Sequence, residues 1–125
     1  MGDPALQSAS YDDLLQVPEH LVAEIMRGTL HTHPRPGPRH ARSASTLGGK
    51  LIDPFGTGSR GPGGWWILDE PELHSGPDIL VPDLAGWRRE RMPSLPETAW
   101  FELAPDWVCE ILSPSTAGKD RSQKM

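Results

Sequence analysis

The sequence has few of the features that mark secreted and membrane proteins. Its 125 residues include one cysteine, Cys109, so no disulfide can form within the chain and a cytoplasmic location is expected. No apolar run approaches the roughly 20 residues that a bilayer-spanning helix needs. The first fifteen residues lack the basic start and apolar centre of a signal peptide. We therefore expect no membrane partner.

Positive charge is also scarce, since the formal net charge is −5. This balance argues against a protein that coats nucleic acid through net charge alone, but it does not exclude a local basic patch. It fits a carboxylate-rich site that a divalent cation would neutralise. The length predicts a single domain over residues 1–125, and the 14 prolines and 13 glycines are scattered, which predicts loops between apolar segments.

The apolar segments predict an ordered series of helices and strands. They comprise a helix over 11–17 capped by Ser10, a β-hairpin over 21–34 turning at Arg27-Gly28, a helix over 40–55, strands over 64–74, 78–87 and 107–112, and a final helix from 115. This order predicts an α/β (α+β) sandwich of sheet and helices.

Two acidic residues interrupt segments that otherwise read as buried strands. Asp83 follows Ile-Leu-Val-Pro, and Glu110 stands between Val-Cys and Ile-Leu. A buried carboxylate without a partner costs several kcal/mol or takes up a proton. The pair therefore suggests a shared hard cation such as Mg²⁺, which prefers carboxylate oxygens and retains water. Glu24 lies between apolar residues in the same way.

Each of these residues also has an ordinary structural interpretation. Asp83 follows a proline and could lie in a loop at a strand end, and Glu110 could face solvent on an edge strand. Glu72 belongs to the segment LDEPELH, which could be a solvated acidic stretch, and His40 could lie on the surface. The sequence alone leaves both interpretations open.

Three motifs in order, LVAEIMRGTL, VPDLAGWRRER and EILSPST, carry a resemblance to a known family. The chain resembles the Uma-two family of restriction-endonuclease-like proteins from about Tyr11 to Met125. That family is similar to the wider PD-(D/E)XK nuclease superfamily. The resemblance implies a restriction-endonuclease-like core with a central mixed sheet flanked by helices.

The resemblance also implies roles for individual residues. Asp83 and Glu110 would be the metal-binding carboxylates, with Glu72 as a supporting ligand. The lysine expected two residues after Glu110 is replaced by Leu112, and Lys124 of the following helix would substitute for it. The implied catalytic set is Asp83, Glu110, Lys124, Glu24 and His40. The implied activity is metal-dependent hydrolysis of DNA phosphodiester bonds, with Mg²⁺ or Mn²⁺ as cofactor.

Two arginine clusters would supply phosphate contacts for a DNA partner, one at 35, 39 and 42 and one at 88, 89 and 91. The alternative for both clusters is that these arginines lie in loops and contact only solvent. A homodimer is also possible as a partner arrangement. Members of the family continue beyond the position of Met125, so we expect a C-terminally truncated domain. The alternative function is an inactive remnant that binds nucleic acid or a partner.

Overall fold

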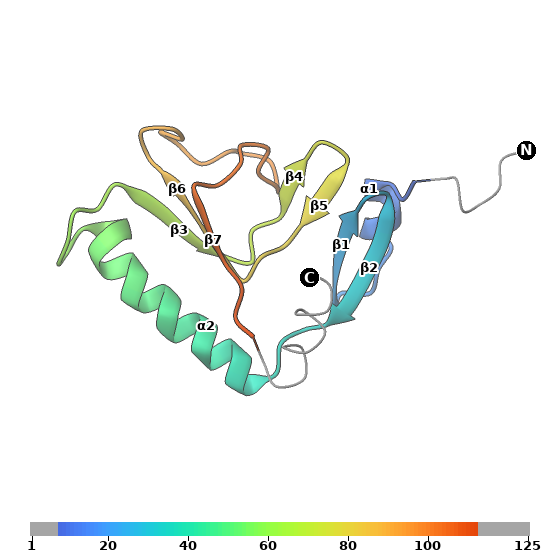
Figure 1. The fold of residues 1–125 in the computed structure, drawn as a ribbon, viewed down its shortest axis with the longest axis horizontal. Helices are drawn as coiled ribbons and strands as arrows, with labels where there is room; N and C mark the ends of the chain where they lie inside the picture. Colours follow the sequence, from blue (N-terminus) through green and yellow to red (C-terminus); the bar gives the residue numbers. More distant parts are fainter. Residues whose placement is uncertain (1–7, 113–125) are drawn as a thin grey trace, which may run out of the picture.

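The computed structural model describes residues 8–112, which form two antiparallel sheets and their flanking helices (Figure 1). The elements are α1 (Tyr11–Leu15), β1 (Leu21–Met26), β2 (Thr29–Pro34), α2 (Pro38–Leu51), the π-helical turn η2 (Ile52–Thr57), β3 (Trp65–Asp69), β4 (Leu73–Ser75), β5 (Asp78–Leu80), β6 (Leu84–Arg88) and β7 (Trp107–Cys109). Within this part of the chain, no helix is long and apolar enough to cross a membrane. The helix predicted from residue 115 lies outside the described residues.

The first helix and the hairpin follow the sequence closely. Ser10 caps α1 in a capping box, in which the Ser10 hydroxyl accepts from the Asp13 N–H and the Asp13 carboxylate accepts from the Ser10 N–H. The hairpin turns at Arg27 and Gly28, with φ of 53° and 79°. Positive φ at both central residues matches the type I′ turn, whose twist suits two-residue hairpins. The hairpin and the Ser10 cap are confirmed, whereas the helix ends at Leu15, two residues before the predicted end.

The second helix begins and ends earlier than the predicted range of 40–55. Pro38 occupies the first turn of α2 after Gly37 at the N-cap, a position where the missing proline N–H costs nothing. The regular helix ends at Leu51, and the chain continues as a π-helical turn through Pro54 to Thr57. The α2 helix lies along the sheet formed by β3, β6 and β7, with Gly48 buried (Figure 1).

The strands predicted over 64–74 and 78–87 are each broken into two. The first breaks at Glu70, whose φ is 47°, and at Pro71; the second breaks around Pro82. Proline cannot donate to a strand ladder, and a positive φ turns the chain out of the extended conformation. The prediction of two continuous strands is therefore wrong, and four shorter strands replace them.

Each broken strand sends its two halves to different sheets. The strand orders are β2-β1-β5-β4 in the first sheet and β3-β6-β7 in the second. Both sheets are antiparallel, where one central mixed sheet was expected. At the crossover the Glu70 N–H donates to the Asp83 carbonyl oxygen at 3.0 Å, which joins the two breaks to each other. The two breaks therefore lie side by side between the sheets.

The buried hydrophobic residues form two clusters. One cluster packs between the sheets and consists of Leu73, Ala85, Trp87 and Met92, with Trp66, Leu68, Leu80 and Phe101 against it. A second cluster under α1 joins Leu14, Ile25 and Ile79. Trp87 is completely buried, and its indole N–H donates to the Leu103 carbonyl, so the largest core side chain has no unsatisfied donor.

The strand predicted over 107–112 is shorter and less buried than expected. Only Trp107–Cys109 pair with β6, and within the described residues β7 stands at the edge of its sheet. Val108 is 52% exposed and Glu110 is exposed. Glu110 therefore does not interrupt a buried strand: it lies just after the end of β7 and is exposed.

Candidate active site

The structure brings Asp83 and Glu110 together at the ends of two paired strands. The ladder between β6 and β7 ends with Leu84 opposite Cys109, so Asp83 and Glu110 are the next residue on each side. Burial raises the pKa of the Cys109 thiol, and the negative charges of Asp83 and Glu110 raise it further. Both carboxylates therefore lie close enough to one thiol to act on its ionisation.

Asp83 is held through one of its two carboxylate oxygens. The Ile111 N–H donates to Asp83 Oδ2 at 2.6 Å, and His40 Nε2 lies 3.3 Å from the same oxygen. The Asp83 side chain is only 15% exposed, so these contacts are shielded from water. Among residues 8–112 both contacts of this carboxylate, the hydrogen bond from Ile111 and the ion-pair contact with His40, are made by Oδ2 and not by Oδ1.

His40 ties the start of α2 to the chain just after β7. Its Nε2 lies 2.9 Å from the Ile111 carbonyl oxygen as well as near Asp83 Oδ2. Both neighbours are acceptors, so Nε2 carries the proton and donates it to the Ile111 carbonyl, while Asp83 Oδ2 lies at ion-pair distance. The other nitrogen, Nδ1, is buried without a hydrogen-bond partner in the described part of the chain. His40 thus acts on the site through Asp83.

Glu24 supports the crossover segment that carries Asp83. The Val81 N–H donates to Glu24 Oε2 at 2.8 Å, and Val81 precedes Pro82 and Asp83 in the break between β5 and β6. Without this bond the amide would be partly buried and unsatisfied. Glu24 therefore fixes the chain two residues before the candidate metal ligand.

Glu72 belongs to a different cluster from Asp83. Its Oε2 accepts from the Tyr11 hydroxyl at 2.9 Å and lies 2.9 Å from His74 Nε2. The His74 ring stacks on Trp100, with centroids 4.8 Å apart. Burial, and then the hydrogen bond to Glu72, raises the pKa of Tyr11. These contacts engage Glu72 between α1 and β4, so the structure does not join it to the Asp83 cluster.

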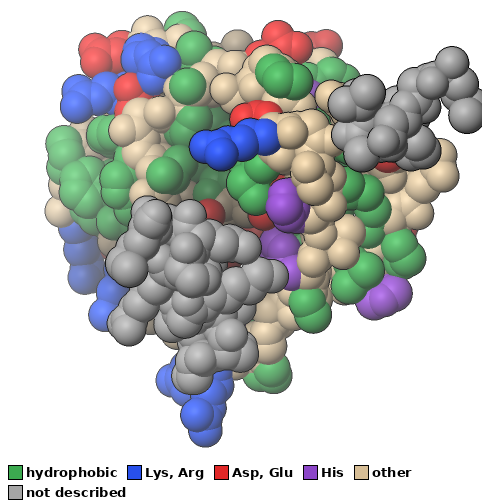
Figure 2. Space-filling view, turned by 45° about the vertical axis from the view of Figure 1, so that its right-hand side comes forward, with side chains coloured by type: hydrophobic (Ala, Val, Ile, Leu, Met, Phe, Trp, Pro, Cys, Tyr) green, Lys and Arg blue, Asp and Glu red, His purple; other side chains and the backbone are tan. Residues whose placement is uncertain are grey.

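Histidine and acidic side chains lie next to one another near the middle of the face shown in Figure 2. Within residues 8–112, however, no group of three or more His, Cys, Asp or Glu side chains is arranged to hold a metal ion. Lys124 lies outside the described residues. The structure thus joins His40 to Asp83, places Glu110 at the neighbouring strand end, supports the segment before Asp83 through Glu24, and engages Glu72 with Tyr11 and His74.

Sequence reasoning missed the backbone groups of the site. The Ile111 N–H and carbonyl both contact the cluster, and the Val81 N–H anchors the crossover. Every residue except proline carries these groups, so no residue type signals them. The apolar run around Glu110 was the available signal, because it places a strand end beside the carboxylates.

The arginine cluster after β6 is engaged in contacts within the protein. Arg91 pairs with Asp106 at 2.6 Å, Arg89 donates to two backbone carbonyls, and Arg88 lies 3.7 Å from Glu90. The pKa of Asp106 is lowered, first by a hydrogen bond from the Arg88 N–H and then by Arg91. This cluster therefore stabilises the loop between β6 and β7.

The other arginine cluster is split. Arg35 donates to the Glu19 carbonyl and lies 3.6 Å from a carboxylate oxygen of Glu70. Arg39 and Arg42 are exposed on α2. Of the six arginines in the two clusters, Arg39 and Arg42 are therefore the ones without a contact to an acidic side chain or a backbone carbonyl within residues 8–112.

Comparisons with known proteins identify the fold and the family of this chain. A solved structure from Anabaena variabilis, described as a putative nuclease belonging to DUF820, superimposes with a TM-score of 0.65 at 24% identity. The match covers 93% of this chain and 65% of that one, so this chain spans slightly less than two thirds of its relative, and the predicted nuclease-like α/β fold is confirmed. No curated protein matches. The model of the family Uma2, "Putative restriction endonuclease", matches residues 9–125, so the chain belongs to this family.

Proposed function

We propose that this protein is a metal-dependent DNA endonuclease that hydrolyses phosphodiester bonds, with Asp83 and Glu110 as the metal-binding carboxylates. The observation that carries the proposal is that the Asp83 carboxylate is held in place by its neighbours. One of its oxygens is fixed by Ile111 and His40, and Glu110 follows the paired residue on the neighbouring strand.

The donor set suits Mg²⁺ or Mn²⁺. Magnesium is commonly held by one or two carboxylates and keeps several waters, so two carboxylates suffice without a third protein ligand. Asp83 Oδ1 and the exposed Glu110 carboxylate are hard oxygen donors at neighbouring positions. When bound, such an ion polarises a phosphate and makes a bound water more acidic.

The remaining residues orient this pair. The Ile111 N–H donates to Asp83 Oδ2, His40 Nε2 lies beside the same oxygen, and Glu24 holds the segment before Asp83. In this scheme His40 and Glu24 are positioning residues. Lys124 is proposed to stabilise negative charge on the phosphate, the role that the resemblance gives it.

Nicking of supercoiled plasmid tests the proposal. The parent should nick DNA with Mg²⁺ or Mn²⁺ and not in EDTA, and Asp83→Asn and Glu110→Gln should each abolish nicking. Glu97→Gln, which changes an exposed carboxylate in the loop after β6, serves as the matched control and should nick like the parent. Metal-dependent nicking that survives both site substitutions would reject the assigned site.

A second measurement separates an inactive domain from a wrong site. Isothermal titration of Mn²⁺ into the parent and into Asp83→Asn reports metal binding without any cleavage. Metal binding that is lost in the variant, together with no nicking by the parent, would indicate an inactive remnant that retains the metal site.

A further inference from the structure

The outward flank of α2 carries a stripe of basic and small polar side chains. Arg39, Arg42, Thr46 and Lys50 recur at intervals of three and four residues, so they lie along one side of the helix, and all four are exposed. The opposite side packs on the sheet, where Gly48 is buried. The helix thus separates an apolar face from a basic one.

The glycines confirm which way each face is turned. A Cβ added at Gly48 would lie 3.6 Å from the Leu84 side chain, whereas one added at Gly49 would meet nothing within 4 Å. His40 lies on the inward side, since its ring contacts Asp83. The basic stripe is therefore separate from the candidate active site.

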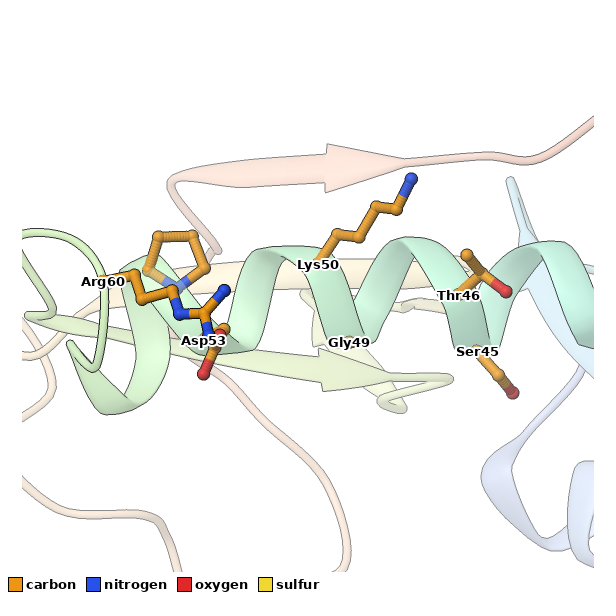
Figure 3. Close-up of a pocket in the computed structure, with 7 residues that line it drawn as sticks. Ser45, Thr46, Gly49, Lys50, Asp53 and Arg60 are labelled. Atoms are coloured by element: carbon orange, nitrogen blue, oxygen red, sulfur yellow. The ribbon is translucent and has the colours of Figure 1, made fainter.

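An open pocket of about 510 Å³ continues the stripe at the C-terminal end of α2 (Figure 3). Its lining residues are Ser45, Thr46, Gly49, Lys50, Asp53, Pro54 and Arg60. Lys50 of α2 and Arg60 of the loop before β3 thus border the same pocket. The hydroxyls of Ser45 and Thr46 also line it. Asp53 is the acidic group in this lining.

The cations of this surface lack acidic partners in the described part of the chain. Arg39, Arg42, Lys50 and Arg60 form no ion pair within residues 8–112, in contrast to Arg91. No acidic residue occurs between 38 and 51. In a protein of net charge −5, this face carries four cations against the single carboxylate of Asp53 and is therefore locally basic.

We propose that this surface, the α2 stripe with its pocket, binds the phosphodiester backbone of a DNA duplex. Basic side chains and hydroxyls on one exposed flank are the groups that contact phosphate oxygens without reading bases. From Arg39 to Lys50 the helix rises about 16 Å, which equals the length of about five base pairs. The proposal rests on the proposed function, because its ligand is the DNA that a nuclease would cleave. It concerns a second surface, which takes no part in the cleavage step.

Binding of a fluorescent duplex oligonucleotide, measured by anisotropy in EDTA over a range of salt concentrations, tests this surface. The variant Arg39→Gln/Arg42→Gln/Lys50→Gln/Arg60→Gln should bind at least about tenfold more weakly. The slope of log K against log salt should become shallower by about 0.9 for each phosphate that the variant no longer neutralises. Asp53→Asn should change binding in the opposite direction and tighten it.

The control is Arg27→Gln, which removes an exposed positive charge from the hairpin turn, away from α2, and should bind like the parent. Thermal unfolding of each variant confirms that it is folded. An unchanged affinity and salt slope in the fourfold variant would overturn the proposal, as would an equal weakening by Arg27→Gln alone. The fourfold variant keeps Asp83 and Glu110, so titration of Mn²⁺ reports the candidate metal site independently of DNA binding, and failure of cleavage and failure of this surface are distinguishable.

Discussion

Asp83→Ala should destabilise the protein as well as abolish the proposed nuclease activity. The substitution removes the acceptor of the Ile111 N–H, at 2.6 Å, and a partner of His40 in a position that is only 15% exposed. A hydrogen bond to a charged group contributes about 1.5 to 3 kcal/mol, and the donor left without its acceptor is poorly hydrated. We expect a loss of about 2 to 3 kcal/mol in the free energy of unfolding.

For a domain of this size, such a loss lowers the melting temperature by about 8 to 12 °C. Asp83→Asn keeps an oxygen that accepts from Ile111, so it should lose about half as much. Urea unfolding in EDTA, followed by circular dichroism, measures both changes without any contribution from metal. Glu97→Ala, at an exposed loop carboxylate, is the control and should stay within about 0.5 kcal/mol of the parent.

An Asp83→Ala variant as stable as the parent in EDTA would refute this account of the carboxylate. In that case the hydrogen bonds to Oδ2 would contribute nothing, and the carboxylate would not be held in a fixed orientation. The expected result has a practical consequence, because it makes Asp83→Asn the better variant for separating lost chemistry from lost folding.

Three further predictions concern other groups of the same structure. A hydrogen bond from the Arg88 N–H lowers the pKa of Asp106, so the ionised Asp106 carboxylate stabilises the fold above its ordinary pKa of 3.8 and does so less as the pH falls. In urea unfolding, the stability difference between the parent and Asp106→Asn should therefore shrink in acid. A difference that stays constant with pH would contradict the assigned cause. Burial and then the Asp83 charge raise the pKa of Cys109, so iodoacetamide should alkylate it slowly and Asp83→Asn should accelerate the reaction; an unchanged rate would show that the two groups are far apart. Glu24→Leu should cost about 1 to 3 kcal/mol by leaving a partly buried amide unpaired, whereas Glu24→Gln should cost less, and equal melting temperatures would exclude the hydrogen bond as the cause.

Local sequence signals determined the elements whose geometry depends on near neighbours. The capping box needs only Ser10 and Asp13, three residues apart, and the hairpin needs two residues that accept positive φ between apolar runs. The two carboxylates also stood out from the sequence, because Asp83 and Glu110 interrupt apolar segments. Such features are written in consecutive residues, so no knowledge of the fold is required to find them.

The strand breaks show where local signals are insufficient. Pro71 and Pro82 were visible in the sequence, but each lies within a run of strand-forming residues. Whether the halves continue in one sheet or enter two depends on which partners they find. The bond between the Glu70 N–H and the Asp83 carbonyl, which joins the two crossovers, is a contact between distant residues.

The sequence by itself determined the residue types, the hairpin, the first helix and the candidate carboxylates. Only the tertiary structure decided that His40 and the backbone of Ile111 hold Asp83, that Glu72 pairs with Tyr11 and His74 instead, and that the basic flank of α2 faces outward. The physical reason is that hydrogen bonds and burial join groups far apart in the chain, and their pairing depends on how the two sheets and α2 pack together.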